Sequence, residues 1–254
     1  TMKMSLERVA TEAMTRKLKA EYSMELAQDL KNVHGLDAEQ ELINIIEYEV
    51  AAEIDRELVD KMNALAVPSV RPWVYALSTS SIAAGSNVSD GRWEQEKFRT
   101  LYTRIVKEAN TIALTTRRGA GNFVVVSPTA LTILQSATTS AFARTTEGTF
   151  EAPTNTKFVG TLNSAMKIYV NGYAADSAPV LIGYKGSSES DAAAFYCPYI
   201  PLMSSGVVLD PSTFEPVVSF MTRYGYVELN NTASSLGNAA DYLGTVSISN
   251  AVFS

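Results

Sequence analysis

The feature that most constrains this chain is a long helical pattern between residues 37 and 66. Asp37, followed by Gln40, has the pattern of a capping box, and Pro68 cannot continue a helix. Apolar residues recur at steps of three and four, which places them on one face. The predicted buried stripe consists of Ile43, Ile46, Val50, Ile54, Leu58, Met62 and Leu65. A helix of about 30 residues is about 45 Å long, which exceeds most helices of globular proteins.

The other faces of this predicted helix are acidic. Eight carboxylates lie there against two cations: Glu39, Glu41, Glu47, Glu49, Glu53, Asp55, Glu57 and Asp60 against Arg56 and Lys61. They are evenly spread, without a close pair in an apolar pocket, so the pattern favours a solvated or partner-facing surface over acid–base catalysis. We expect a structural beam, with Glu49, Glu53 and Glu57 as candidate subunit-interface residues.

The rest of the chain mixes helical and strand patterns, and its order indicates an α+β fold of two lobes. Further helices are predicted at 24–33, 93–116 and 128–136; strands at 122–126, 157–162, 166–170, 180–184, 192–198, 217–229 and 244–253; and extended chain or a hairpin at 4–22. The predicted buried face of the second long helix is Phe98, Leu101, Ile105, Ala109 and Ile112. Two segments poor in core-forming residues, 78–91 and 138–155, are expected to be exposed loops.

Composition excludes several function classes. The net charge is −6 and no basic face is visible in the sequence, which argues against a protein that grips DNA. The single cysteine, Cys197, excludes an internal disulfide and a cysteine metal cage, and its apolar neighbours predict a buried thiol. The sequence contains no apolar stretch long enough to span a membrane and no signal-peptide pattern, so we expect a cytoplasmic protein.

The sequence motifs do not predict a catalytic or ligand-binding site. His34 is the only histidine, and its place before Gly35 favours a role at a helix end over a metal site or a catalytic triad. Arg117 and Arg118 open a glycine-rich turn, but this turn follows a helix, whereas a phosphate-binding turn precedes one. Arg223 alternates with tyrosines, as on a strand with one packed face. We expect no catalytic, metal-binding or cofactor-binding residues, and Arg117, Arg118 and Arg223 remain interface candidates.

One run of residues resembles a known family. Residues 21–39, with 17–20 before them and 53–57 after them, resemble the major capsid proteins of T-even-type tailed bacteriophages. Further similar segments follow in the same order: 92–94 with Phe98, 118–123, 183–186, 191–192, 196–199 and 222–225. The resemblance covers almost the whole chain.

The resemblance implies the Hong Kong 97-like phage capsid fold, in which a long spine helix belongs to a peripheral domain and an axial domain surrounds the capsomer axis. The expected division is a peripheral domain at 1–66 with the spine helix at 37–66, an axial domain at 67–221, and C-terminal strands at 222–254 that complete the peripheral domain. The family's N-terminal arm and extended E-loop are expected to be absent from this chain. The loops 78–91 and 138–155 would be capsomer contacts or mobile tips.

The implied function is that of a major capsid protein, a structural subunit rather than an enzyme. It would assemble with copies of itself, mainly as homo-hexameric capsomers, into an icosahedral head in the host cytoplasm, and would be part of the virion. Vertex and decoration proteins would be further partners, and the shell would enclose double-stranded DNA without binding it specifically. Three alternatives stay open: the pentamer-forming vertex paralogue, an encapsulin-type compartment, and a hydrolase acting through Ser127 or a carboxylate.

Overall fold

The computed structural model describes residues 10–35, 37–70, 72–74, 94–137, 142–144, 157–162, 165–188, 191–213, 215–229 and 238–249. The chain divides into two compact units: unit 1 holds residues 1–54 and 194–228, and unit 2 holds residues 55–193 and 229–254. The loop predicted at 78–91 lies outside the described residues, and so does the loop at 138–155 apart from 142–144.

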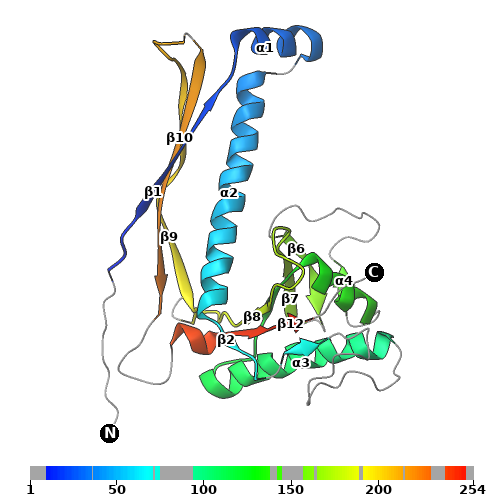
Figure 1. The fold of residues 1–254 in the computed structure, drawn as a ribbon. Helices are drawn as coiled ribbons and strands as arrows, with labels where there is room; N and C mark the ends of the chain where they lie inside the picture. The colour runs from blue at the N-terminus through cyan, green and yellow to red at the C-terminus, as the bar shows by residue number, and fades with distance from the viewer. Residues whose placement is uncertain are drawn as a thin grey trace. The chain divides into compact units, whose positions relative to one another are not determined.

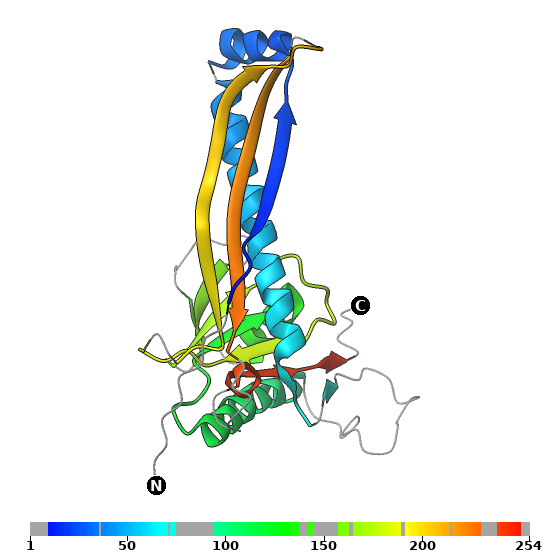
Figure 2. The same cartoon turned by 90° about the vertical axis from the view of Figure 1, so that its left-hand side faces the viewer.

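Unit 1 is a three-stranded antiparallel sheet with the N-terminal part of a long helix packed on one face (Figures 1 and 2). Its elements are β1 (Met14–Glu21), α1 (Met24–Asp29), a π-helical turn (Leu30–His34), the first part of α2 (Ala38–Leu65), β9 (Ala194–Leu209) and β10 (Pro216–Glu228). The strand order is β1-β10-β9, and Leu18 of β1 pairs with Phe220 of β10. Ile46 and Val50 of α2 pack against Val218 and Phe220 to form the core of this unit.

Unit 2 contains a seven-stranded mixed sheet in the order β2-β11-β8-β4-β7-β6-β5. Its elements are the rest of α2, β2 (Val67–Pro68), β3 (Trp73–Val74), α3 (Glu94–Thr116), β4 (Phe123–Val126), α4 (Pro128–Ala137), β5 (Phe142–Arg144), β6 (Lys157–Leu162), β7 (Met166–Val170), β8 (Val180–Gly183), a 3-10 turn (Ala239–Tyr242), β11 (Leu243–Val246) and β12 (Ile248–Ser249). All five residues of the predicted α3 face are buried in the main core of this unit. The indole Nε1 of Trp73 donates a hydrogen bond to Thr100 Oγ1 of α3 at 2.9 Å.

The boundaries of the two units differ from the predicted divisions at 66/67 and 221/222. β9 and β10 pair antiparallel from Pro216 with Leu209 to Glu228 with Ala194, so both strands belong to one unit. β11 pairs with β8 and β2, which places the C-terminal segment in unit 2 rather than beside β10. Strand pairing between distant segments therefore accounts for the placement of β9, β10 and the C-terminal segment, whereas the boundary at 54/55 lies within α2.

The single buried stripe predicted for α2 is only partly right in its second half, where Met62 and Leu65 pack against the core of unit 2 without being fully buried. Ile46 and Val50 are buried in unit 1, but the residues buried in unit 2 are Val59 and Ala66, which lie outside the predicted stripe. At about 100° per residue, Val59 lies about 140° from Ile46 around the helix. The remaining stripe residues, Ile43, Ile54, Leu58, Met62 and Leu65, are half-buried. The helix thus presents different faces to its packing partners along its length.

Helix ends follow the local sequence. Ser23 Oγ accepts a hydrogen bond from the N–H of Leu26 at the start of α1, and Gly35 ends the π-helical turn with a left-handed φ of 68°. At α4, Ser127 Oγ accepts from the N–H of Ala130 at 3.2 Å, and Pro128 occupies the first helical position. The predicted helices at 24–33 and 128–136 are confirmed within one residue.

Cys197 is exposed, which contradicts the prediction of a buried thiol. β9 is the edge strand of a three-stranded sheet, so the apolar run around Cys197 has a neighbouring strand on one side only. Consecutive side chains of a strand point to opposite faces, yet Tyr196 and Cys197 are both exposed. The apolar run therefore predicts the strand correctly here, but it does not predict that Cys197 is buried.

Candidate subunit-interface residues

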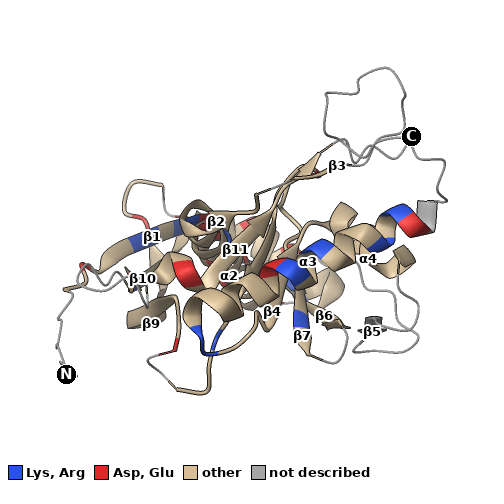
Figure 3. Cartoon of the chain, turned by 90° about the horizontal axis from the view of Figure 1, so that it is seen from below, with Lys and Arg blue, Asp and Glu red and all other residues tan. Residues whose placement is uncertain are grey.

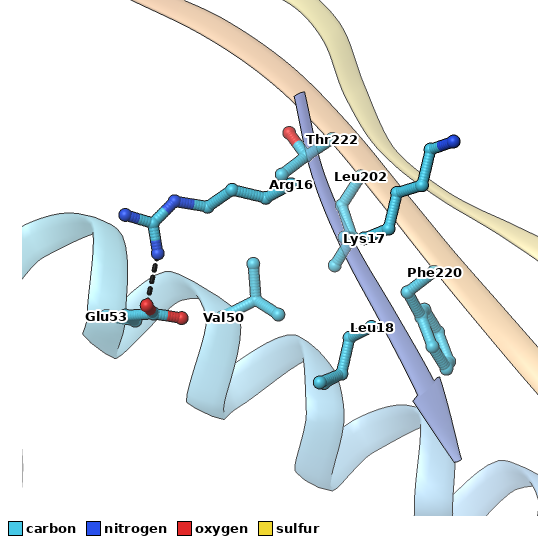
Figure 4. Close-up of a pocket in the computed structure, with 8 residues that line it drawn as sticks. All are labelled: Arg16, Lys17, Leu18, Val50, Glu53, Leu202, Phe220 and Thr222. Atoms are coloured by element: carbon cyan, nitrogen blue, oxygen red, sulfur yellow. Dashed lines mark ion pairs between the residues drawn. The ribbon is translucent and has the colours of Figure 1, made fainter. Parts of the chain in front are cut away.

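Glu53 forms an ion pair with Arg16, which joins α2 to β1 within unit 1 (Figure 4). The pair lies at the rim of a pocket of about 190 Å³, lined by Arg16, Lys17, Leu18, Val50, Glu53, Leu202, Phe220 and Thr222. The Arg16 guanidinium also lies over the Tyr224 ring, 5.8 Å from its centroid. The Glu53 side chain keeps 64% of its surface exposed, so the pair leaves this carboxylate accessible.

Glu49 and Glu57 differ in their ion pairs and in their exposure. Glu49 is exposed on α2 and forms no ion pair with any residue that the structure describes. Glu57 pairs with Lys61 one turn further along α2, at 2.6 Å, and its side chain is 25% exposed. Among the three glutamates, Glu49 is therefore the one whose charge is fully available to a partner.

A second ion-pair network fixes β1 to the turn between β9 and β10. Lys19 pairs with Glu21 and, at 3.5 Å, with Asp210. Asp210 also accepts hydrogen bonds from the backbone N–H of Ser212 at 2.9 Å and from its hydroxyl at 2.7 Å. These bonds, with Lys19, lower the pKa of Asp210 below its ordinary value. The sequence offered no signal for the link between Lys19 and Asp210, because these two residues are far apart in the chain.

Arg223 holds the segment that leads into β1. Its Nε donates a hydrogen bond to the carbonyl oxygen of Ala13 at 3.3 Å, and its guanidinium lies 5.5 Å from the centroid of the Tyr199 ring. The Tyr199 side chain is 72% exposed, so this cation–aromatic pair faces solvent on β9. The expected strand with alternating faces is confirmed, since Thr222 and Tyr224 are buried on either side of exposed Arg223.

Arg117 and Arg118 lie in the turn that ends α3. Arg117 has a φ of 55°, a left-handed conformation uncommon for a residue with a side chain, and it is exposed. Arg118 forms an ion pair with Asp191 in the loop after β8. The turn therefore ends a helix, as the sequence indicated, and it leaves Arg117 free of ion pairs with the described residues.

His34 and Ser127, the two residues considered for catalysis, both lie at helix ends. His34 is exposed at the end of the π-helical turn, and Ser127 is buried with its hydroxyl oxygen capping α4. Within the described ranges, no cluster of three or more His, Cys, Asp or Glu side chains could hold a metal ion. In the same part of the chain, no helix is long and apolar enough to cross a membrane.

The fold matches solved structures from bacteriophages. A protein of Mycobacterium phage Che8 aligns with a TM-score of 0.53 at 12% identity, covering 95% of this chain and 72% of that one. A chain from the mature capsid of bacteriophage PhiM1 aligns with a TM-score of 0.51 at 13% identity, covering 98% and 77%. The α+β architecture is therefore a fold that also occurs in a mature phage capsid.

The sequence comparison identifies the family. The family model described as Major capsid protein Gp23 matches residues 1–249. The major capsid protein of Vibrio phage KVP40 is 37% identical over 251 residues, covering 94% of this chain and 48% of the relative. That of Enterobacteria phage T4 is 38% identical over 246 residues, covering 92% and 46%. The chain belongs to the Gp23 major capsid protein family, a family of structural proteins and not of enzymes, and it spans about half the length of these relatives.

Proposed function

We propose that this chain is a shell-building subunit of a phage head. The observation that carries the proposal is the family match over residues 1–249, joined to a fold shared with a mature phage capsid. The described residues support it, because exposed charged and aromatic side chains such as Glu49, Arg117 and Tyr199 suit contacts between subunits better than turnover.

Unit 1 is proposed to be the peripheral domain and unit 2 the axial domain, with α2 as the spine helix. This keeps the two domains expected from the resemblance but moves their boundaries to those of the compact units. The long β9–β10 hairpin then belongs to the peripheral domain, and the seven-stranded sheet with α3 and α4 belongs to the axial domain.

The proposed partners are copies of this chain in homo-hexameric capsomers, with vertex and decoration proteins as further contacts and virion DNA inside the shell. Rings form when one surface patch repeatedly meets a different patch of the next copy. Of the six candidate residues, Glu49 is the one proposed to reach a neighbouring subunit, since its side chain is exposed, forms no ion pair with the described residues and lies outside the basic segment at the end of α3. Assembly would take place in the host cytoplasm.

The test is the assembly state of the purified chain. Size-exclusion chromatography coupled to light scattering gives the mass of the assembly. Class averages from electron microscopy give the rotational symmetry of the rings. Six-fold rings or closed shells are expected, whereas five-fold rings alone would assign the chain to the vertex paralogue. A folded chain that stays monomeric as its concentration is raised would contradict the shell function.

A further inference from the structure

The exposed side of α3 carries a concentration of positive charge that the chain as a whole does not have. Across α3 and the two residues that follow it, 94–118, the sequence has six cations and three carboxylates, a net charge of +3 in a chain of net charge −6. The cations are Lys97, Arg99, Arg104, Lys107, Arg117 and Arg118. Figure 3 shows basic residues recurring along α3 with few acidic ones between them. We call the surface from Lys97 to Arg117 the α3 basic surface.

Three cations of the α3 basic surface are exposed to solvent: Arg99, Lys107 and Arg117. The opposite side of the helix is buried in unit 2 through the face that includes Leu101 and Ile105, so exposed Arg99 and Lys107 lie away from the core. Arg99 and Lys107 are exposed, and neither forms an ion pair with any residue that the structure describes. From Lys97 to Arg117 the surface extends about 30 Å at 1.5 Å per residue.

The chemistry of this surface fits a linear polyanion. We infer that α3 contacts the phosphate backbone of double-stranded nucleic acid without reading its sequence. A duplex presents about one negative charge per 1.7 Å of its axis, and a row of Lys and Arg binds it by releasing counterions. The inference goes beyond the shell function and does not depend on it.

The neutral residues between the cations argue against an acidic protein as the partner. Protein interfaces are built around aromatic and apolar anchors, but the exposed side of α3 offers Thr100, Thr103, Asn110 and Thr111, with Leu114 as its large exposed apolar residue. Tyr102 packs against the core, so no exposed aromatic ring on this helix offers a platform for single-stranded bases. A duplex backbone needs neither kind of anchor.

The contact would be loose and electrostatic. The hydroxyls of Thr103 and Thr111 donate to carbonyl oxygens of the preceding turn, at 3.2 and 3.0 Å, and Thr100 donates to the Lys97 carbonyl at 2.6 Å. Their protons are therefore used within the helix, and affinity has to come from the lysines and arginines. Binding should depend steeply on salt and little on sequence.

The experiment measures binding of the whole 254-residue chain to a labelled duplex by fluorescence anisotropy. A duplex of about 20 base pairs is roughly twice as long as the α3 basic surface, and salt is varied from about 50 to 200 mM. The test variant is Arg99→Gln/Lys107→Gln. The matched control, Lys31→Gln/Arg56→Gln, removes the same charge from exposed positions on the π-helical turn and on α2. Circular dichroism verifies that both variants are folded.

The slope of log affinity against log salt should fall in magnitude by roughly 1.8 in the α3 variant, because each lost phosphate contact contributes about 0.9. The control should keep the slope of the unmodified chain. Equal losses in both variants would show that net charge, not this surface, is responsible. No binding by the unmodified chain at low salt, or stronger binding to polyglutamate of matched charge, would also overturn the inference. Ring formation by the α3 variant is followed separately by electron microscopy, so failure of this inference is distinguished from failure of the shell function.

Discussion

Asn122 clamps the backbone of Lys185 with both ends of its side-chain amide: Nδ2 donates to the Lys185 carbonyl oxygen at 2.6 Å, and Oδ1 accepts from its N–H at 3.0 Å. The backbone N–H of Asn122 also donates to the carbonyl oxygen of Gly183 at 2.8 Å. These bonds tie the turn after α3 to the loop after β8. The same loop holds Asp191, the partner of Arg118.

Replacing Asn122 should therefore loosen the turn that carries Arg117 and Arg118. Asn122→Ala removes two hydrogen bonds and should lower the free energy of unfolding by about 1–2 kcal/mol. Asn122→Asp should cost more, because it places a carboxylate oxygen against the Lys185 carbonyl. Urea denaturation measures both changes. Equal stability of Asn122→Asp and the unmodified chain would show that the clamp contributes nothing.

Two isoleucines of α2 test which face of the helix is buried in unit 1. Ile46 is 7% exposed and packs against Val218 and Phe220, whereas Ile54 is half-buried. Ile46→Ala should cost about 2–5 kcal/mol, and Ile54→Ala should cost clearly less because fewer of its contacts are lost. Chemical denaturation of the two variants gives the comparison. A larger loss for Ile54→Ala would restore the single stripe that the sequence predicted.

The two long helices differ in how far their sequences predicted the buried face. The face of α3 was predicted correctly because its five apolar residues all pack into one unit, so one helical period describes them. On α2 the same reasoning was right only in part, because the helix contributes to two units and buries Val59, outside the predicted stripe, on a different face from Ile46. A periodic pattern identifies a helix, but it does not say that the helix has one partner.

The interface candidates also show that local sequence patterns do not predict contacts between distant segments. The acidic residues of α2 were predicted as a group, yet Glu53 pairs with Arg16 and Glu57 with Lys61, while Glu49 stays free within the described part of the chain. The first of these pairs depends on β1 lying beside α2, and no local pattern encodes that placement. The basic surface of α3 was missed because whole-chain charge hides a local excess of the opposite sign.

Asp210 should make unit 1 sensitive to acid. Hydrogen bonds from Ser212 and the charge of Lys19 lower the pKa of Asp210 in the folded chain, so its ionised form is favoured by folding. The resulting stability is present above the unfolded-state pKa, near 3.8, and is lost as the pH falls through the lower folded-state pKa. Asp210→Asn should therefore flatten the fall in thermal midpoint below that pH, and Ser212→Ala should flatten it partly. An acid profile unchanged in both variants would contradict this linkage.

Charge reversal at Glu49 and at Glu53 separates a contact within the chain from a contact between subunits. Glu53→Lys places a lysine beside Arg16, so the variant should lose stability as a monomer, by about 0.2–1 kcal/mol for the exposed pair plus a repulsion of similar size. Glu49→Lys removes no ion pair among the described residues, so the free energy of unfolding of the monomer should stay within about 0.5 kcal/mol of the original. If Glu49 meets a cation of a neighbouring subunit, this second variant should nevertheless assemble more weakly, and raising the salt concentration should reduce the difference by screening the contact. Urea denaturation and sedimentation of the assembled rings measure the two quantities on the same samples. Normal assembly of Glu49→Lys at low salt would exclude Glu49 from the subunit interface. If Glu49→Lys lost more stability than Glu53→Lys, the Glu49 side chain would have a role inside unit 1.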